Sequence, residues 1–412
     1  MNKISKACFL AKIEEVLTRG VGQILPGKED LGQLMQKQKI RLYLGIDPTS
    51  PEIHLGHTIP LRKLKQFQDL GHEVILLIGT FTARIGDPSE RDKKRKPLTP
   101  KQIEKNMATY KKQASKILDF SKVKIKYNGD WLEKLTFADL IKLASHFTVH
   151  QLLERDMFQE RIKRGGEVWL NEFMYPIMQG YDSVAMNVDL EVGSTDQTFN
   201  MLVGRKLQKI YNNKEKFVLT TPMLVGVDGR KMSKIYGNTV NLTDAPREMY
   251  FKLMYLRDEL IIEYFNLCTD VEIELIMQMA KDIKTSKINP MNFKKQLAYE
   301  IVKMYHGEKS AKNAEKSFEK EVQRGEYPGY IPTATGSFST KKGNKISVID
   351  LLLEVADNLE IPSKSEAKRI IIQGGVGIDG KRYKNPYEQI QIKGGEVVRY
   401  GKKNYVRLVL SK

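Results

Sequence analysis

The stretch from Arg41 to Ile78 constrains the fold most strongly, because short apolar runs alternate there with a helical pattern. The segment "IRLYLGI" reads as a strand, "HTIPLRKLKQFQDLG" as a helix that ends at Gly71, and "EVILLIG" as a strand buried on both faces. Strand, helix and strand in this order form a βαβ unit. Its repetition up to about Met201 predicts a doubly wound parallel sheet, which binds ligands at the carboxyl ends of its strands.

The length of 412 residues predicts more than one domain, because a single core stops growing at about 250–300 residues. We expect a Rossmann-like α/β domain over 1–238. Amphipathic patterns with little strand signal predict an α-helical domain over 239–326. A linker rich in Gly, Pro, Ser and Thr should cover 327–345, and a small α+β domain should follow over 346–412.

Basic residues outnumber acidic ones, with 68 Lys and Arg against 50 Asp and Glu, for a formal net charge of +18. This balance favours a polyanionic partner, and nucleic acid ahead of an acidic membrane surface. The alternative is compositional, since AT-rich genomes also raise lysine content. Charge therefore needs support from motifs before it indicates a function.

Several features predict a cytoplasmic protein with no membrane partner. Cys8 and Cys268 have no His or Cys companions at metal-ligand spacing, so we expect two reduced thiols. The longest apolar run, Val74–Ile78, is far shorter than the ~20 residues that span a bilayer. The N-terminal segment carries Glu14 and Glu15 and lacks the features of a signal or transit peptide.

The segment "IDPTSPEIHLGH" places His54 and His57 where the first strand gives way to a helix. In the first turn of a helix, both rings project from one face beside backbone N–H groups and the positive end of the helix dipole, which favours a phosphate. Gly56 would let a ligand approach the backbone closely. The spacing alone is equally consistent with two surface histidines at a helix start.

A second polar segment, "GRKMSKIYGN" from Gly229 to Asn238, offers Lys231 and Lys234 as mobile positive charges. Such charges suit a polyphosphate whose charge shifts during a reaction. Taken alone, the segment could be a solvated surface loop. Chance rarely supplies HLGH and KMSK together in one chain.

These two motifs resemble the HIGH and KMSKS signatures of class I aminoacyl-tRNA synthetases. The resemblance implies that the histidines and the lysine loop stabilise the α-phosphate transition state while an amino acid carboxylate displaces pyrophosphate from ATP. The carboxylate is already ionised at neutral pH, so no general base is needed. Catalysis then consists of positioning and electrostatic stabilisation.

The segment "FMYPIMQGYDSV" places Tyr175, Gln179 and Asp182 at i, i+4 and i+7, as one polar stripe on an apolar helix. Such a stripe could face solvent, and Pro176 would either start or kink the helix. Yet this pattern resembles the amino acid pocket of bacterial-type tyrosyl-tRNA synthetases, as do "LYLGIDPT", "IGDPS" and "VGSTDQTFN". The resemblance covers most of the chain, and it implies a tyrosine-tRNA ligase.

The resemblance assigns the amino acid pocket residue by residue. The side chains concerned are Asp87, Tyr175 and Gln179 for the α-amino group of tyrosine, Tyr43 and Asp182 for its phenolic hydroxyl, and Gln197 for its carboxylate and the forming acyl phosphate. A site built to hydrogen-bond a hydroxyl rejects phenylalanine, because its own polar groups are then left unpaired; this enzyme family is itself the standard example.

The resemblance also assigns the ATP side of the site. The groups along the phosphate path would be Asp47, Thr49 and His54, with His57 and Asp196 nearer the ribose, Gly56 at the helix start, and Lys231 and Lys234 on the phosphates. Magnesium should arrive with ATP, since no protein cage for it is evident and no organic cofactor is expected.

Three positions depart from the family pattern. The final serine of KMSKS is Ile235, which removes a hydroxyl from the loop. After "GDPS" the family has glycine and a basic residue, whereas Glu90 and Arg91 stand here; we expect Arg91 and Arg95 to contact pyrophosphate. Tyr43 occupies a position that is often lysine in the long-chain branch.

The C-terminal segment "SKSEAKRIIIQGGVGIDGKRY" predicts a basic helix, a glycine stop and a hairpin. Basic helix faces are commonly just solvated. The motif nevertheless resembles the S4-like RNA-binding fold, which contacts phosphates and RNA shape. The candidate tRNA-binding residues are Lys364, Lys368, Arg369, Lys381 and Arg382.

By the same resemblance, 1–238 would be the catalytic domain, 239–326 would meet the anticodon region, and 346–412 would be an S4-like domain of a homodimer that binds tyrosine tRNA. Two alternatives stay open. One is a synthetase for another aromatic amino acid, against which Tyr43 and Asp182 argue. The other is a non-catalytic paralogue that acts as an RNA-binding factor, against which the intact HLGH, KMSK and DQ motifs argue.

Overall fold

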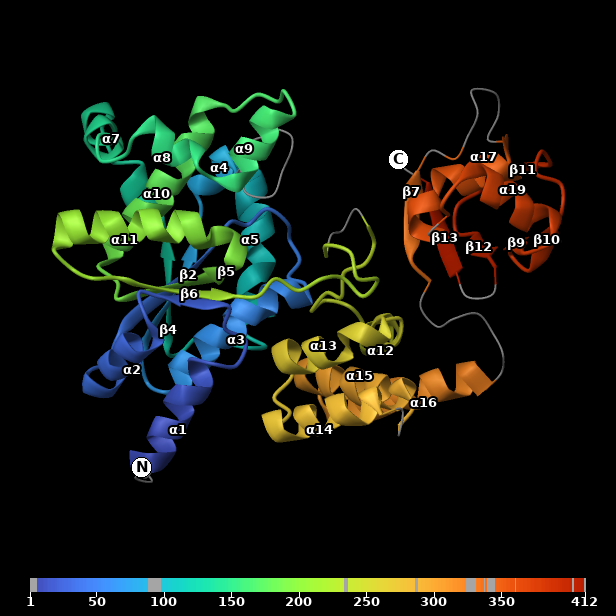
Figure 1. The fold of residues 1–412 in the computed structure, drawn as a ribbon, viewed down its shortest axis with the longest axis horizontal. Helices are drawn as coiled ribbons and strands as arrows, with labels where there is room; N and C mark the ends of the chain where they lie inside the picture. Colours follow the sequence, from blue (N-terminus) through green and yellow to red (C-terminus); the bar gives the residue numbers. More distant parts are fainter. Residues whose placement is uncertain are drawn as a thin grey trace. The chain divides into compact units, whose positions relative to one another are not determined.

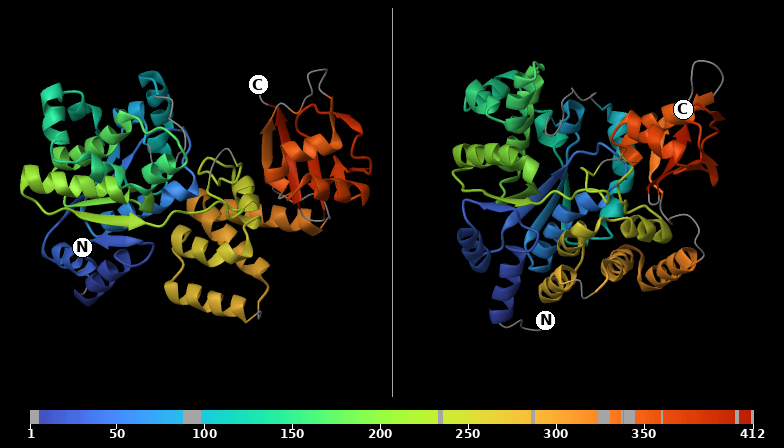
Figure 2. Two further views of the ribbon diagram at one scale, coloured as in Figure 1. Left: turned by 45° about the horizontal axis from the view of Figure 1, so that its top comes forward. Right: turned by 45° about the vertical axis from the view of Figure 1, so that its right-hand side comes forward.

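The computed structural model describes residues 6–87, 98–232, 236–285, 288–323, 331–336, 338, 345–359, 361–401 and 404–410. The chain divides into two compact units (Figure 1, Figure 2). The first comprises Met1–Leu224, Asn241–Thr243 and Phe265–Ile273; the second comprises Val225–Val240, Asp244–Tyr264 and Glu274–Lys412. Apart from the linker, which is discussed below, the division by residue number stays a prediction. No helix in the described ranges is long and apolar enough to cross a membrane.

A six-stranded sheet forms the core of the first unit, in the order β1-β6-β5-β2-β3-β4. Edge strand β1 is antiparallel to β6, and the other neighbours are parallel. The predicted doubly wound parallel sheet is confirmed. The strands are β1 Gln23–Leu25, β2 Arg41–Ile46, β3 Glu73–Ile78, β4 Val123–Tyr127, β5 Leu190–Ser194 and β6 Phe217–Thr221.

The predicted βαβ unit consists of β2, α3 (Leu55–Asp69) and β3. Strand β3 is buried from Val74 to Ile78, as expected for a strand with helices on both faces. The chain leaves α3 at Gly71, whose φ of 85° is a conformation that glycine adopts without strain.

Helices cover both faces of this sheet (Figure 1). Helix α3 packs on β2, β3 and β5, and α11 (Thr198–Asn212) packs on β5 and β6. The connections β2–α3–β3 and β5–α11–β6 proceed in opposite directions along the sheet, so right-handed crossovers place α3 and α11 on opposite faces. The change of direction between β2 and β5 opens a crevice at their carboxyl ends.

Helix α10 (Leu170–Met186) lies against α11 on this second face. Two glycines permit the close approach: a Cβ at Gly180 would lie 2.8 Å from Cγ1 of Val203 and 3.1 Å from the backbone nitrogen of Gly204. The helix continues through Pro176, so this proline neither starts nor ends it. Tyr175, Gln179 and Asp182 are thereby carried on one helix, as predicted.

The remaining helices of the first unit are α5, with 15 residues, and several shorter helices. They are α1 Lys6–Val16, α2 Lys28–Lys37, α4 Thr82–Ile85, α5 Pro100–Ala114, α6 Gly129–Leu132, α7 Phe137–Ala144, α8 Val149–Leu153, α9 Asp156–Lys163 and the 3₁₀ turn Thr195–Gln197.

Helices predominate in the first half of the second unit, as the amphipathic patterns predict. Helices α12, α15 and α16 pack together, and the rings of Phe251 and Phe318 meet edge to face with centroids 5.2 Å apart. The helices are α12 Pro246–Met254, α13 Ile261–Cys268 (shared with the first unit), α14 Ile273–Lys284, α15 Pro290–His306 and α16 Glu308–Gln323, with a 3₁₀ turn at Asp258–Leu260.

The C-terminal part begins with the short strands β7 (Thr333–Gly336) and β8 (Lys345–Ser347), continues with helices, and has its remaining strands after Gly375. Its five-stranded sheet has the order β10-β9-β12-β13-β7, and β11 pairs with β8. Its elements are α17 Val348–Glu354, α18 Ala356–Leu359, α19 Lys364–Ile372, β7 Thr333–Gly336, β8 Lys345–Ser347, β9 Val376–Ile378, β10 Lys381–Tyr383, β11 Gln389–Gln391, β12 Val397–Tyr400 and β13 Asn404–Leu410.

One expectation about the linker is wrong. Within 327–345, residues Thr333–Gly336 form strand β7, which pairs in parallel with β13. The segment "TATG" has a weak strand signal of its own, and pairing with a long partner strand overrides it. This stretch therefore belongs to the C-terminal sheet and not to a linker.

Candidate active site

The crevice at the carboxyl ends of β2 and β5 gathers most of the predicted site residues. Asp47 follows β2 directly, and Asp196 and Gln197 follow β5 in a 3₁₀ turn. These positions flank the point where the strand order reverses. Ligands of open α/β sheets bind at this place.

Asp47 joins the strand end to two helices. It accepts hydrogen bonds from the Thr82 hydroxyl at 2.7 Å and from the Tyr175 hydroxyl at 2.8 Å. A Cβ at Gly79 would lie 1.9 Å from Oδ1 of Asp47, so only glycine leaves room for this carboxylate. Thr49 lies in the following turn, where its N–H donates to the Asp47 carbonyl at 2.8 Å.

Asp182 is the most deeply buried carboxylate of the predicted pocket, with 2% of its surface exposed. It accepts a hydrogen bond from Trp131 Nε1 at 2.8 Å and one from Asn128 Nδ2 at 3.3 Å. Burial raises the pKa of Asp182 well above its usual value, and these two donors oppose that rise. Each oxygen can still accept a further bond, such as one from a ligand hydroxyl.

Tyr43 is fully buried, and its hydroxyl lies 3.0 Å from Oγ of Ser183. Burial raises its pKa well above the usual value, and the carboxylates of Glu191 and Asp182 add to the rise. Tyr43 is therefore neutral. Its role with Asp182 on a phenolic hydroxyl stays a prediction, and the bond to Ser183 is a contact that the sequence did not indicate.

A chain of amide and carboxylate groups crosses the crevice. Gln197 Nε2 donates to Asp87 at 2.7 Å and to Asp196 at 3.0 Å. Asn200 Nδ2 donates to Gln197 at 3.1 Å and to Gln179 at 3.0 Å. The structure thus links Asp87, Gln179 and Gln197, three residues predicted to surround the amino acid backbone.

The amide group of Gln179 also contacts the sheet: its Nε2 donates to Oε1 of Glu191, on β5, at 3.0 Å. Tyr175, four residues earlier on α10, is buried, and its pKa is raised well above the usual value by burial and by the nearby carboxylates Asp47 and Asp87. Neutral hydroxyl, amide and charged carboxylate groups therefore converge here. Such a set can orient an ammonium group by hydrogen bonds and charge.

The HLGH segment forms the N-terminus of α3, as predicted. His54 is the N-cap, its N–H donates to Nδ1 of His57 at 3.3 Å, and the two rings stack with centroids 3.7 Å apart and planes inclined by 25°. His54 also forms a β-bridge with Asn241. Gly56 lies in this first turn beside backbone N–H groups, an arrangement that suits an anion.

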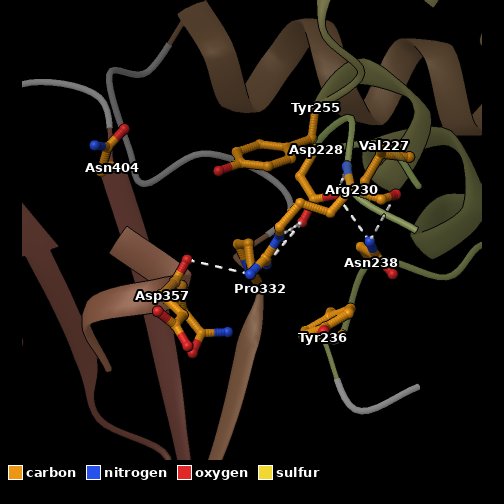
Figure 3. Close-up of a pocket in the computed structure, with 11 residues that line it drawn as sticks. Val227, Asp228, Arg230, Tyr236, Asn238, Tyr255, Pro332, Asp357 and Asn404 are labelled. Atoms are coloured by element: carbon orange, nitrogen blue, oxygen red, sulfur yellow. Dashed lines mark hydrogen bonds and ion pairs between the residues drawn. The ribbon is translucent and has the colours of Figure 1, made fainter. Parts of the chain in front are cut away.

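A side-chain network holds the base of the KMSK segment in the second unit (Figure 3). Asp228 accepts hydrogen bonds from Arg230 Nε and from Asn238 Nδ2, both at 2.8 Å, and Asn238 also donates to the Lys231 carbonyl at 3.0 Å. Lys231 pairs with Val225 in a β-bridge, and its side chain is exposed. The two ends of the loop are therefore tied together.

Several predicted site residues lie outside the described part of the chain. They are Arg91, Arg95, Lys234 and the departure at Ile235. Their proposed contacts stay predictions.

The five predicted tRNA-binding residues are exposed, on helix α19 and strand β10. Lys368 lies over the Tyr387 ring, 5.5 Å from its centroid, and Lys381 lies 4.6 Å from the centroid of Tyr383. Arg369 forms an ion pair with Glu366, and Lys381 with Glu388. Basic groups beside aromatic rings suit an RNA surface.

Sequence reasoning missed five residues that support the site: Asn128, Trp131, Ser183, Glu191 and Lys216. Asn128 and Trp131 come directly after β4, and that position at a strand's carboxyl end is the signal that could have found them. Glu191 and Lys216 are charges next to apolar residues in or beside strands β5 and β6. The sequence alone does not show that these two charges form a buried pair, because that depends on which strands are neighbours in the sheet.

Residues 35–323 match the family model described as tRNA synthetases class I (W and Y). The sequence is 46% identical to a tyrosine–tRNA ligase of Thermotoga maritima, and the match covers 96% of this chain and 96% of that one. The chain belongs to the bacterial-type tyrosyl-tRNA synthetase family. A tyrosine–tRNA ligase of Haemophilus influenzae is 42% identical, again over 96% of both chains. The predicted family is confirmed.

Solved structures of tyrosyl-tRNA synthetases have a similar fold. A C-terminally truncated mitochondrial enzyme of Coccidioides posadasii gives a TM-score of 0.60 at 24% identity, covering 75% of this chain and 91% of that one. The enzyme of Archaeoglobus fulgidus, solved with L-tyrosine, gives 0.61 at 24% identity, covering 74% and 99%. These likenesses support the Rossmann-like fold assigned above.

The described residues contain no group of three or more His, Cys, Asp or Glu side chains placed to hold a metal ion. In a tyrosyl-tRNA synthetase, ATP is the nucleotide substrate that the family implies.

Proposed function

We propose that this chain is a tyrosine-tRNA ligase: it activates L-tyrosine with ATP to tyrosyl-adenylate and pyrophosphate, and transfers tyrosine to the 3′ end of its tRNA. The observation that carries the proposal is Asp182, a buried carboxylate held by Trp131 and Asn128 at the carboxyl ends of the strands. Relatives 40–46% identical over nearly the whole chain are tyrosine–tRNA ligases. No observation favours the non-catalytic RNA-binding alternative.

In the proposed pocket, the phenolic hydroxyl of tyrosine donates to Asp182, with Tyr43 beside it. Phenylalanine would bury the same carboxylate without the hydrogen bond from the ligand, which costs far more than the removal of one methyl group from an apolar pocket. Asp87, Tyr175 and Gln179 would hold the ammonium group. Their mutual hydrogen bonds through Gln197 and Asp47 pre-organise them for it.

For the ATP side, we propose that the N-terminus of α3, with Thr49 and His54, binds the phosphates and stabilises charge on the α-phosphate during attack, while His57 lies nearer the ribose. Lys231 and Lys234 of the KMSK segment would neutralise the departing pyrophosphate, with Arg91 and Arg95. Asp196 would accept from the ribose hydroxyls. Mg²⁺ would enter with ATP, bound mainly by phosphate oxygens.

The proposal includes tRNA on the basic C-terminal part and a homodimer. Exposed apolar side chains support the dimer: Phe137 on α7 is 78% exposed and Leu170 at the start of α10 is 75% exposed, with Ile141 and Val149 also exposed. Helices α7 and α10 contact each other, and exposed apolar groups on neighbouring elements are typical of protein interfaces. A cytoplasmic location agrees with the bacterial relatives.

The test is tyrosylation of unfractionated bacterial tRNA by the full-length chain with ATP and labelled tyrosine. We expect label to become attached to tRNA through an ester that mild base releases. Incorporation of another amino acid, or RNA binding without any incorporation, would contradict the proposal.

A further inference from the structure

A buried ion pair lies beneath the proposed tyrosine pocket, among β2, β5, β6 and α10. Lys216, which precedes β6, has no exposed surface, and Glu191 of β5 has 2%. Their side chains form an ion pair, and Lys216 also donates to Ser183 Oγ at 2.8 Å and to the Met201 carbonyl at 3.1 Å. We call Lys216, Glu191, Ser183 and Tyr43 the Lys216 cluster.

The charge and the hydrogen-bond donors of Lys216 are satisfied within the protein. A buried charge persists only when it is paired and hydrogen-bonded, and all three N–H donors of the Lys216 ammonium have acceptors. Space is reserved for it at Gly204, where a Cβ would lie 2.5 Å from Nζ of Lys216 and 2.8 Å from Oγ of Ser183. A buried pair is weak evidence for stability by itself, because an apolar pair of similar volume often serves as well.

Two contacts connect this pair to the proposed pocket. Glu191 accepts from Lys216 with one oxygen and, with the other, from Gln179 Nε2 at 3.0 Å. Ser183, which accepts from Lys216, lies 3.0 Å from the Tyr43 hydroxyl, and the ammonium lies 5.9 Å from the Tyr43 ring centroid. Tyr43 and Glu191 are also register partners on β2 and β5.

We propose that Lys216 and Glu191 are positioning residues for tyrosine: the ion pair fixes Gln179 and Tyr43 from below, so that both present their polar groups to the substrate. The inference rests on the proposed function. It predicts that loss of the ion pair changes the KM for tyrosine and not the KM for ATP, because both connections lead to residues assigned to tyrosine.

The test compares Lys216→Met with the double variant Lys216→Met/Glu191→Leu, by ATP–pyrophosphate exchange and thermal unfolding. The single variant leaves a buried carboxylate unpaired, whereas the double variant removes both charges and should regain folding stability. We expect the KM for tyrosine to rise about tenfold or more in both, with the KM for ATP within about twofold of the wild type. The ratio of kcat/KM for tyrosine to kcat/KM for phenylalanine should fall as the KM for tyrosine rises.

Lys63→Met is the matched control. Lys63 is another buried lysine, but its Nζ donates to the carbonyls of Val16 and Arg19 and to Gln66, each at 2.7 Å, with no connection to the pocket. It should lose stability without any change in the KM for tyrosine. A double variant of the cluster with normal stability and a normal KM for tyrosine would overturn the positioning role.

Ser183→Ala retains the ion pair between Lys216 and Glu191. It tests the positioning role even if the other variants fail to fold. It removes the connection to the Tyr43 hydroxyl, so the KM for tyrosine should rise by about threefold, the effect of one neutral hydrogen bond. An unchanged KM with an unchanged tyrosine-to-phenylalanine ratio would contradict the inference. If the wild type does not exchange with tyrosine, the proposed function itself fails, which is a distinct result.

Discussion

At the scale of single residues, the proposed selection of tyrosine depends on how Asp182 is held. A buried carboxylate without donors would protonate and could rotate away from its ligand. Trp131 and Asn128 oppose this, because each donates a hydrogen bond that favours the ionised form, although burial still raises the pKa of Asp182 well above its usual value. The sequence alone did not identify Trp131 and Asn128 as hydrogen-bond donors to Asp182. Their placement depends on β4 ending beside α10, which the strand pattern alone does not specify.

Trp131→Phe should weaken tyrosine activation. It removes the 2.8 Å bond to Asp182, so kcat/KM for tyrosine should fall by about tenfold, while that for phenylalanine changes little. Because the Trp131 N–H lowers the Asp182 pKa, its loss raises that pKa further and moves the acid limb of the tyrosine profile to higher pH. Equal losses for both amino acids would contradict this role.

His54→Ala and Lys231→Ala should each lower tyrosyl-adenylate formation by about 10²-fold or more, the loss expected when one preorganised transition-state contact is removed. Single-turnover adenylate formation at saturating tyrosine and ATP measures this directly. The affinity for tyrosine should stay near that of the wild type, because neither side chain is assigned to the amino acid. Unchanged rates in both variants would refute the proposed chemistry.

At the scale of elements, the unit β2–α3–β3 was predictable because its two strands are continuous apolar runs and its helix ends at a glycine. Strand β7 was not, because a short segment of Thr, Ala and Gly is a strand only when β13 pairs with it. The stripe of Tyr175, Gln179 and Asp182 was visible in the sequence. Its burial depended on partners distant along the chain, because Asp182 contacts Trp131 and Asn128 and Tyr175 contacts Asp47.

His72, between α3 and β3, should make the stability of this unit depend on pH. It is 6% exposed, its Nδ1 accepts from the Ile40 N–H at 3.3 Å, and burial lowers its pKa to about 4. The unfolded state, with a pKa near 6.5, therefore binds more protons below neutral pH. Between about pH 7 and about pH 5, this group alone should cost about 2 kcal/mol of unfolding free energy.

Urea unfolding of the wild type and His72→Asn at both pH values isolates this contribution. Asparagine offers an oxygen near the position of Nδ1 and does not titrate, so the variant should lose about 2 kcal/mol less on acidification. The same pH dependence in both proteins would show that His72 is not responsible.

At the scale of the whole molecule, the net charge of +18 agrees with the tRNA partner that the family implies. The charge in the sequence pointed to a polyanion, and the motifs, not the charge, identified the reaction. The sequence could not specify how the buried charges Glu191 and Lys216 pair, because residues so distant along the chain meet only when β5 and β6 align.

Replacing Lys364, Lys368 and Lys381 together by alanine should weaken tRNA binding without altering tyrosine-dependent pyrophosphate exchange in the absence of tRNA. Each RNA phosphate that the variant no longer neutralises should reduce the slope of log affinity against log salt by about one. Binding of tyrosine tRNA measured across a salt series checks this. An unchanged salt slope would mean that this face does not contact RNA.

The most direct test of the central claim is amino-acid-dependent ATP–pyrophosphate exchange, run with each of the twenty amino acids separately and without tRNA. We expect exchange with tyrosine alone, which would support both the reaction and the pocket around Asp182 and Tyr43. Exchange with a different amino acid, or with none, would contradict the account.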